Sequence, residues 1–283
     1  MTPINRPPRT WNLSAFYTQH ISARGVPIVG SSQVAPAALY EAFYLINALL
    51  FRRPDIRRVI IQSRVRCAVM AAAELTTQIP EHADLIPASF WDRRARGLGA
   101  TPTRPAVSCG EENLLHYPGD PYVGESILIH EFAHVIHLFG LRTLDSDFDR
   151  RLHRSYRRAI RQGLWRGTYA GSCPEEYWAE GVQSWFDANQ PADPSHNGIN
   201  TRERLEDYDP TLADLIAGVF RSRTWRYRPP CERPAESCWE MPTSPPTFTW
   251  PDRLEDWWRD HLDMSTSPPR VRKRRQRTTE RPI

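Results

Sequence analysis

One stretch limits what this chain can fold into more than any other: residues 125–140, which contain the pattern His-Glu-x-x-His. Residues four apart lie on one face of an α-helix, about 6 Å apart along its axis, so His130 and His134 can hold one metal ion between them. Glu131 lies one position round the helix, where its carboxylate can meet a water on that metal. The pattern predicts a metal-binding helix, and zinc is the ion that suits it.

The residues around the two histidines predict that this helix is buried and ends near Gly140, since glycine is a common helix end. A buried histidine needs a partner for its ring nitrogens, and a bound metal supplies one. The alternative is a chance match made by ordinary core histidines. The apolar residues that support a buried helix are Ile127, Leu128, Phe132, Val135, Ile136 and Phe139.

Two histidines leave a catalytic zinc one protein ligand short, because such a site has three protein ligands and an open position. His137 lies one helical turn beyond His134, and we expect it to be a hydrogen-bonded histidine beside the site rather than the third ligand. A metzincin would have its third histidine at position 140, where this chain has Gly140. The sequence therefore excludes that class of metallopeptidase.

A second predicted helix, within residues 172–187, offers the missing ligand. Glu176 and Glu180 lie four residues apart among aromatic side chains, so both carboxylates face the same way. Burying two carboxylates is costly without cations or donors. One carboxylate binding zinc and the other accepting a histidine N–H would satisfy both, whereas the alternative is an exposed acidic stripe. Ser172 with Glu175 predicts a capping box at the start of this helix.

His130–His134, Tyr169 and the run Glu176–Glu180 together resemble the catalytic domain of anthrax-toxin lethal factor and the related Pro-Pro endopeptidases, which are gluzincin-type zinc metallopeptidases. The family pattern is a tyrosine, six residues, and then Glu-aromatic-aromatic-Ala-Glu, and the spacing here is the same. The likeness covers residues 124–187. It implies these roles: zinc ligands His130, His134 and Glu176; general base Glu131; oxyanion stabiliser Tyr169; and Glu180 as a carboxylate that holds a ligand histidine.

The remaining sequence predicts one α+β, mainly helical, zincin-like domain with a small sheet, spanning residues 12–230. An irregular arm, residues 1–11, precedes it, and a poorly ordered tail rich in Pro and Arg, residues 231–283, follows it. We expect that residues 232–283 can be removed with little loss of stability. Glu111 and Glu112 are expected to be solvated loop acids. The expected elements are strands at 26–32, 65–70, 96–99 and 112–115, helices at 36–51, 54–63, 146–162 and 209–220, and a loop at 76–90.

Charge and composition indicate which binding partners and which cellular compartment to expect. The formal net charge is +4, but residues 270–283 carry seven Lys or Arg against Glu280, so the rest of the chain is close to neutral and nucleic acid is not the expected partner. The basic end could be a nuclear address or an anion-binding tail, although we expect a solvated segment. The sequence shows no signal peptide and no apolar run that we expect to span a membrane. The default compartment is cytoplasmic, with secretion as the alternative.

The five cysteines form no Cys-x-x-Cys pair. Cys109 and Cys173 lie near the two predicted motif helices, and they could form a disulfide or remain free thiols. The sequence leaves both states open, as it does the oligomeric state.

The predicted function is that of a zinc-dependent metalloendopeptidase acting on a peptide or protein substrate. Two alternatives remain. The chain could be a zinc-binding module that cleaves nothing, or a protein with a structural metal whose basic tail associates with nucleic acid. Glu131 argues against both, because a purely structural site has no use for a carboxylate beside an open coordination position.

Overall fold

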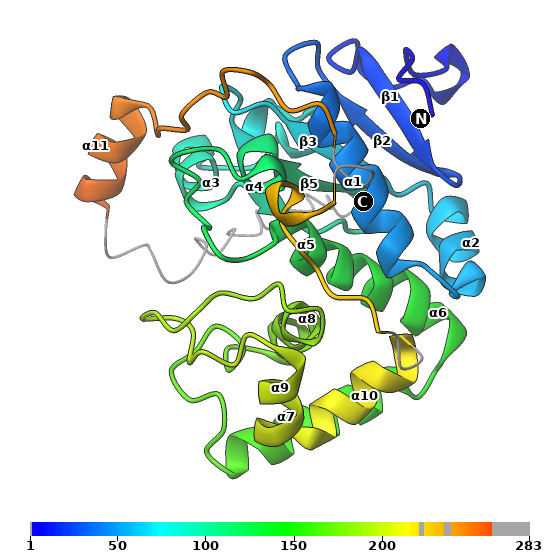
Figure 1. The fold of residues 1–283 in the computed structure, drawn as a ribbon, viewed down its shortest axis with the longest axis vertical. Coiled ribbons are helices and arrows are strands. Elements are labelled where there is room, and N and C mark those ends of the chain that lie inside the picture. Colours follow the sequence, from blue (N-terminus) through cyan, green and yellow to red (C-terminus); the bar gives the residue numbers. More distant parts are fainter. Residues whose placement is uncertain (1, 221–223, 235–238, 262–283) are drawn as a thin grey trace, which may run out of the picture.

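The computed structural model describes residues 2–220, 224–234 and 239–261. The protein is a mixed α/β structure in which one small sheet lies beside two groups of helices (Figure 1). The sheet has five strands in the order β1-β2-β3-β5-β4. The inner pairs β2–β3 and β3–β5 are parallel, whereas β1 and β4 are antiparallel to their neighbours. The strands are β1 Gln19–Ala23, β2 Val26–Gly30, β3 Arg66–Met70, β4 Gly97–Leu98 and β5 Ala106–Gly110.

Three strands confirm the sequence predictions, and two were missed. β2, β3 and β4 fall within the predicted ranges 26–32, 65–70 and 96–99. β1 and β5 carry small and polar residues with weak strand preference. β5 is nevertheless buried along its whole length, because it pairs with β3 on one side and β4 on the other. The sheet is thus set by strand pairing as much as by local composition.

Four helices, α1 to α4, precede the central helix in the sequence, and the first two of them begin at a proline. α1 spans Pro36–Leu49 and α2 spans Pro54–Gln62, and both confirm the predicted helices, since proline suits a first helical turn. The segment predicted as a loop, residues 76–90, contains two short 3-10 turns and the start of α3, Ala88–Arg94. The strand predicted at 112–115 is wrong, because these residues form the helix α4, Glu111–Leu115.

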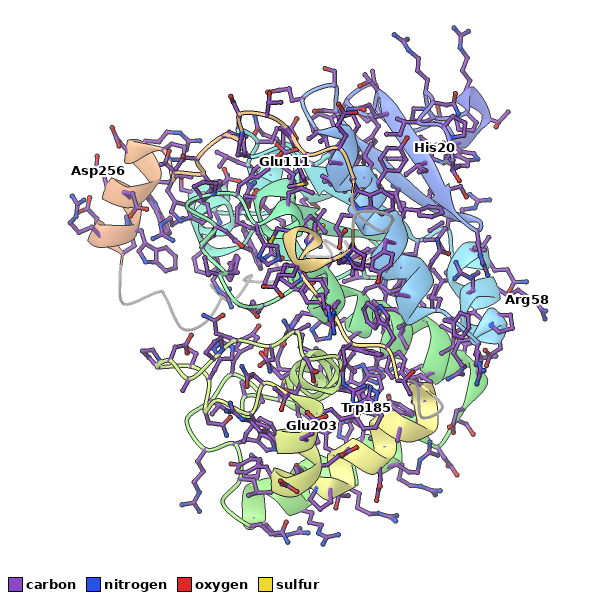
Figure 2. The ribbon with its side chains drawn as sticks, viewed as in Figure 1. His20, Arg58, Glu111, Trp185, Glu203 and Asp256 are labelled. Atoms are coloured by element: carbon purple, nitrogen blue, oxygen red, sulfur yellow. The ribbon has the colours of Figure 1, made fainter. Side chains whose placement is uncertain are left out.

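The expectation that Glu111 and Glu112 are solvated is also wrong. Glu111, labelled in Figure 2, is buried and accepts hydrogen bonds from the backbone N–H groups of Ala35 at 2.7 Å and Ala72 at 3.0 Å. Glu112 is buried against Arg96, with Nε and Oε1 2.6 Å apart. Buried carboxylates of this kind need such partners, and a single sequence does not reveal them.

The central helix α5, Ile127–Val135, lies between the sheet and the lower group of helices (Figure 1). It does not end at Gly140 as expected, because it continues as a π-helical stretch, Ile136–Leu141, and then as α6, Arg142–Leu144. Gly140 instead lies where this helical segment packs closely against α2. A Cβ there would lie 2.7 Å from Cγ2 of Ile56, so glycine lets α2 approach closely.

The run Ile127–Leu144 is, by length and composition, apolar enough to cross a membrane, which the sequence prediction overlooked. However, 67% of it is buried inside the protein, as expected for a core helix.

The lower group comprises α7 Phe148–Arg161, α8 Pro174–Trp185, α9 Arg202–Tyr208 and α10 Pro210–Phe220. α7 and α10 confirm the helices predicted at 146–162 and 209–220. α8 packs directly on α5, where the indole Nε1 of Trp178 donates to the carbonyl of Ala133 at 2.9 Å. This contact aligns the two helices that carry the motif residues.

From residue 224 the described chain returns across the sheet half of the protein and leads to α11, Asp252–Asp260 (Figure 1). Arg233 forms a buried ion pair with Glu41, and the N–H of Phe248 donates to the carbonyl of Pro118 at 2.8 Å. The described part of the expected tail therefore contacts the body, while the domain boundaries at 12 and 230 stay predictions. The basic end, residues 270–283, lies outside the described residues.

The cysteine alternatives are also distinguished by the structure. Cys109 and Cys173 are free thiols, and so are Cys67 and Cys231. Cys109 is buried in β5, whereas Cys173 immediately precedes α8.

Candidate functional site

The site is assembled from two crossing helices. α5 presents His130 and His134 one turn apart, and α8 presents Glu176 in its first turn. Pro174 occupies the first turn of α8 as expected, but the predicted capping box is absent. The hydroxyl of Ser172 donates to the carbonyl of Tyr169 at 2.7 Å, and the cap residue is Cys173.

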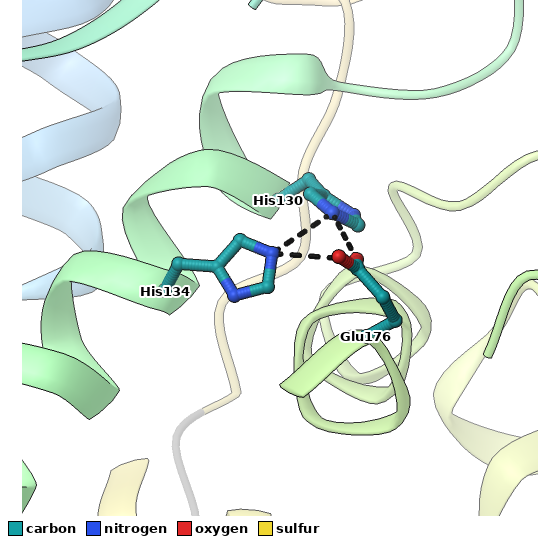
Figure 3. Close-up of side chains that lie close together, drawn as sticks. All are labelled: His130, His134 and Glu176. Carbon is teal, nitrogen blue, oxygen red and sulfur yellow. Dashed lines mark hydrogen bonds and ion pairs between the residues drawn. The ribbon is translucent and has the colours of Figure 1, made fainter. Parts of the chain in front are cut away.

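Three side-chain atoms form a small triangle (Figure 3). His130 Nε2 lies 3.0 Å from Glu176 Oε2 and 3.2 Å from His134 Nε2, and His134 Nε2 lies 3.4 Å from the same Glu176 oxygen. Ligands on a tetrahedral zinc with bonds of about 2.0–2.1 Å are roughly 3.3 Å apart. The residues that the motif singled out therefore meet at metal-ligand spacing.

The proton on His130 can be placed from its neighbour Gln183. The amide Nε2 of Gln183 donates to Glu125 Oε2 at 3.0 Å and to the carbonyl of Ser126 at 3.2 Å, so its Oε1 is the acceptor. This oxygen lies 2.8 Å from His130 Nδ1, which must then carry the hydrogen. In the neutral ring, Nε2 consequently presents a lone pair to Glu176.

The donor set therefore fits a metal ion. In the neutral ring, a lone pair on His130 Nε2 facing a carboxylate oxygen 3.0 Å away is repulsive, and either a proton on Nε2 or a cation between the two atoms removes that repulsion. Two imidazole nitrogens and one carboxylate suit a divalent ion of borderline softness such as zinc. His130, His134 and Glu176 are the residues that would hold it.

Gln183 and Glu125 were missed by the sequence prediction. Gln183 lies seven residues after Glu176 and three after Glu180, so all three share one face of α8. That periodicity is the signal that could have found Gln183. The sequence contains no such signal for Glu125, because this residue precedes α5 and meets Gln183 only where the two helices cross.

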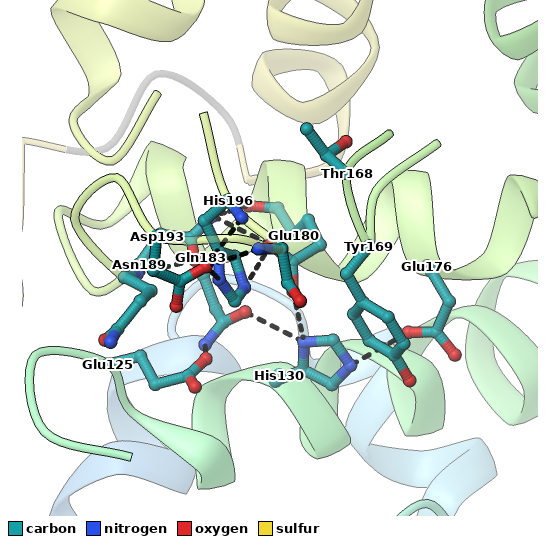
Figure 4. A network of polar contacts seen from close by, with 12 residues as sticks. Glu125, His130, Thr168, Tyr169, Glu176, Glu180, Gln183, Asn189, Asp193 and His196 are labelled. Carbon is teal, nitrogen blue, oxygen red and sulfur yellow. Dashed lines mark hydrogen bonds and ion pairs between the residues drawn. The ribbon is translucent and has the colours of Figure 1, made fainter. Parts of the chain in front are cut away.

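Glu180 is placed on the Nδ1 side of His130, opposite the triangle (Figure 4). Its Oε1 lies 3.3 Å from His130 Nδ1, farther than Gln183 Oε1 at 2.8 Å. Its Oε2 accepts from the amide of Asn189 at 3.1 Å and lies 3.5 Å from His196 Nε2. Glu180 thus contacts His130, a predicted metal ligand, and it shares that contact with Gln183.

Glu131 is partly buried at the wall of a cleft and faces two glycines across it. A Cβ at Gly99 would lie 3.3 Å from Glu131 Oε2, and one at Gly97 would lie 3.4 Å from its Cγ. Within the described chain, no residue donates a hydrogen bond to the Glu131 carboxylate. Burial raises the pKa of Glu131, and the nearby His130 and His134 oppose that rise. The carboxylate is thus free to accept a proton.

Tyr169 reaches the site from the loop before α8. Its ring stacks on His130, with centroids 6.0 Å apart, and its N–H donates to the carbonyl of Ser195 at 2.8 Å. Burial raises the pKa of Tyr169 above its usual range, and the charge of Glu176 adds to this. Its hydroxyl consequently stays protonated and can act as a donor.

The charges of the triangle support one another. Burial by itself disfavours charge on Glu176, yet its contacts with His130 and His134 lower its pKa well below the ordinary value. Burial likewise disfavours an imidazolium, but Glu176 and Glu180 outweigh it and raise the pKa of His130. The site is therefore built to hold positive charge beside an ionised Glu176.

Two neighbouring cavities, of about 490 Å³ and 360 Å³, lie beside the triangle. His130, Glu131 and Tyr169 line both of them. The larger cavity extends toward His196 and is bordered by Trp258 of α11. The smaller one extends along the edge of the sheet at Leu98.

His137 lies apart from the triangle, as expected. Its Nε2 contacts Asp149 Oδ1 at 2.6 Å, and the other oxygen of Asp149 accepts from Arg142 at 2.7 Å. His137 is therefore a hydrogen-bonded core histidine that ties the π-helical stretch to α7.

The comparisons with known proteins add little to this geometry. No protein-family model and no curated protein matches the sequence. Among solved structures, the Pro-Pro endopeptidase PPEP-2 from Paenibacillus alvei is similar with a TM-score of 0.46 and 17% identity, over 68% of this chain and 97% of that chain. Similarity at this level carries no argument about activity, so function has to be inferred from the site.

Proposed function

We propose that the protein is a zinc-dependent metalloendopeptidase. The observation that carries the proposal is the convergence of His130, His134 and Glu176 at ligand spacing. The carboxylate of Glu131, which accepts no hydrogen bond from any residue that the structure describes, lies in the same cleft. A structural zinc site is closed by four protein ligands, whereas these three leave a position open. That open position distinguishes a catalytic site.

The chain's own residues can perform the proton transfers of peptide hydrolysis. When bound, zinc would polarise the substrate carbonyl and lower the pKa of a water at the site. Glu131 would accept a proton from the attacking water and deliver it to the leaving amine. Tyr169 would donate its O–H to the negative charge that develops on the carbonyl oxygen. Gln183 would hold His130 in the orientation that presents Nε2.

The shape of the cleft supports internal cleavage of an extended chain. The two cavities both lie beside the triangle, so substrate can continue from the cut bond into each of them. β4 borders the smaller cavity, and among the described residues it pairs with β5 alone, which leaves its other edge available to an extended peptide. A peptide or protein segment is therefore the substrate class that the cleft suits.

A digest of an unbiased peptide library tests this proposal. The zinc-loaded protein should cleave internal bonds, whereas chelator-treated protein should not. Glu131→Gln should retain zinc and lose cleavage by about two to four orders of magnitude, because it keeps the shape but removes the base. Glu206→Gln, on the exposed side of α9, is the matched control and should cleave normally. Stoichiometric zinc without any cleavage would favour the non-catalytic binding module instead.

A further inference from the structure

A second group of potential ligands lies on the other side of His130 from the triangle. Glu125 precedes α5, Glu180 belongs to α8, and His196 comes from the loop after α8 (Figure 4). One ligand atom from each of the three lies within 4.8 Å of the other two. Neither the HExxH pattern nor the proposed hydrolysis uses Glu125 or His196.

The two carboxylates of this group are buried, and the basic side chains beside them are histidines: His130 Nδ1 lies 3.3 Å and His196 Nε2 lies 3.5 Å from the oxygens of Glu180. Glu125 is 7% exposed and Glu180 is 2% exposed. Within the described residues, no lysine or arginine forms an ion pair with either of them. Gln183 and Asn189 donate one neutral hydrogen bond to each. Two buried anions side by side are costly unless a cation compensates them.

The two carboxylate oxygens of Glu125 differ in their hydrogen bonds. Gln183 donates to Oε2, but no donor for Oε1 is found in the part of the chain that the structure describes. Glu125 lines the 490 Å³ cavity together with Glu180 and His196. Glu125 Oε1 is therefore available to a ligand that enters the cavity.

His196 is oriented as a metal ligand. Its Nδ1 lies 2.9 Å from Asp193 Oδ1, so the ring donates from Nδ1 and its neutral form has a lone pair on Nε2. Nε2 lies 3.5 Å from Glu180 Oε2, too far for a good hydrogen bond but suitable for two ligands of one ion. A carboxylate that fixes the tautomer of a histidine is the usual outer support of a metal site.

We propose that Glu125, Glu180 and His196 bind a second divalent cation of the zinc or manganese class. Each ligand has its own supporting partner, namely Gln183 for Glu125, Asn189 for Glu180 and Asp193 for His196. Mixed imidazole and carboxylate ligands within 4.8 Å of one another suit such ions, whereas a quaternary ammonium group has no N–H to donate to the imidazole lone pair.

The second cation would act on the first site through Glu180. Its Oε2 faces His196, while its Oε1 contacts Nδ1 of His130. Fixing Glu180 on a cation would hold its other oxygen against the ligand histidine. Occupancy of the second site should therefore increase zinc affinity at the triangle, by an amount comparable to that of outer ligand partners, roughly 10-fold.

The experiment counts metal ions on the full chain. Metal-free protein is titrated with zinc, and separately with manganese, and bound metal is measured by elemental analysis after gel filtration. Wild type should hold about two ions per chain. His196→Ala and Glu125→Gln should each hold about one, and His134→Ala should lose the other ion. His153→Ala is the matched control, since this histidine belongs to neither group, and it should keep both ions.

The outcomes separate the two proposals. One ion that is lost in His134→Ala but kept in His196→Ala would overturn the second site and leave the proposed peptidase intact. Two ions that both survive in His196→Ala and in Glu125→Gln would also overturn it. Complete absence of bound metal would overturn the proposed function as well. His196 lies in a loop, so His196→Ala tests the site even if Glu125→Gln does not fold.

Discussion

His130 donates its Nδ1–H to Oε1 of Gln183, 2.8 Å away, and this bond decides which nitrogen of His130 faces Glu176. The orientation of Gln183 is itself determined by Glu125, which accepts from the other end of the amide. A chain of two hydrogen bonds therefore connects a buried carboxylate to a potential metal ligand. Such outer partners hold a ligand ring in place and increase its basicity.

The first prediction concerns Gln183. Gln183→Met keeps the volume but removes the acceptor, so His130 can rotate or change tautomer. Zinc affinity should fall by roughly 10–100-fold. Competition with a chromophoric chelator measures this, and circular dichroism checks that the variant is folded. Gln162→Met, an exposed glutamine at the end of α7, is the control. Unchanged affinity in Gln183→Met would show that Gln183 does not orient the ring.

The second prediction concerns Tyr169. Tyr169→Phe keeps the stacking on His130 and removes only the hydroxyl donor. The charge on the substrate oxygen exists only along the reaction path, so kcat should fall by about 100-fold or more while KM changes little. Steady-state kinetics on one cleaved peptide separates the two constants. Tyr40→Phe, outside the cleft, should leave both unchanged. A Tyr169→Phe enzyme with wild-type kcat would exclude the donor role.

The part of the site that sequence could predict is the part governed by local geometry. The spacing of His130 and His134 works because a single helix places residues four apart on one face. Glu176 could be paired with them because an aromatic helix carrying two carboxylates needs cations, and because Tyr169 precedes it at a recognisable interval. The structure brings these four residues to one cleft.

What sequence could not predict depends on contacts between distant segments. Gln183 meets His130, and Arg96 meets Glu112, only after the helices and strands have packed. Charged residues are usually exposed, so Glu112 gave no sign of its buried partner. β5 was missed because its place inside the sheet comes from pairing with β3 and β4, whereas small residues such as Ser108 favour no strand locally.

The third prediction separates the two glutamates of α8. Glu176 Oε2 lies 3.0 Å from Nε2 of His130, whereas Glu180 faces Nδ1. Glu176→Ala should therefore abolish tight zinc binding at the histidine pair, while Glu180→Ala should weaken it by roughly 10–100-fold. Glu175→Ala, which removes an exposed contact to Arg142, is the control on the same helix. Equilibrium dialysis at several zinc concentrations gives the three affinities. Loss of zinc in Glu180→Ala with retention in Glu176→Ala would reverse the assignment.

The fourth prediction concerns stability against pH. Burial raises the pKa of Asp120 to about 6, although the N–H of Tyr122 and the amide of Asn113 oppose the rise. The folded protein thus holds this proton at pH values where the unfolded chain has lost it. The associated stability is complete below about pH 4 and is lost as the pH rises through about 6.

Asp120→Asn removes this titration. The free energy of unfolding of wild type relative to Asp120→Asn should fall between about pH 4 and pH 6.5, by at most about 3 kcal/mol. Urea unfolding of chelator-treated protein across this range measures the difference. Asp214→Asn, on the exposed side of α10, should track wild type at every pH. Parallel curves for wild type and Asp120→Asn would show that Asp120 titrates normally.

The last prediction concerns the segment that sequence analysis treated as removable. Arg233 forms an ion pair with Glu41 in which the side chains are 3% and 0% exposed, with N–O distances of 2.5 and 2.7 Å. Trp239 adds a third hydrogen bond to Glu41, at 2.9 Å. Removing residues 232–283 would leave Glu41 charged and buried in α1 without a cation. An uncompensated buried charge of this kind costs about 3–5 kcal/mol.

Arg233→Met isolates that effect, because it keeps most of the apolar stem and removes the charge. The free energy of unfolding should fall by about 3–5 kcal/mol, and adding Glu41→Leu should recover part of the loss, since the buried carboxylate is then gone too. Arg228→Met, an exposed arginine five residues earlier, should be nearly neutral. Denaturant unfolding of wild type, Arg233→Met, Glu41→Leu and the double variant completes the cycle. If Arg233→Met and truncation after residue 231 both unfolded like wild type, the contact would be dispensable and the domain would end near residue 230, as the composition of the tail first indicated.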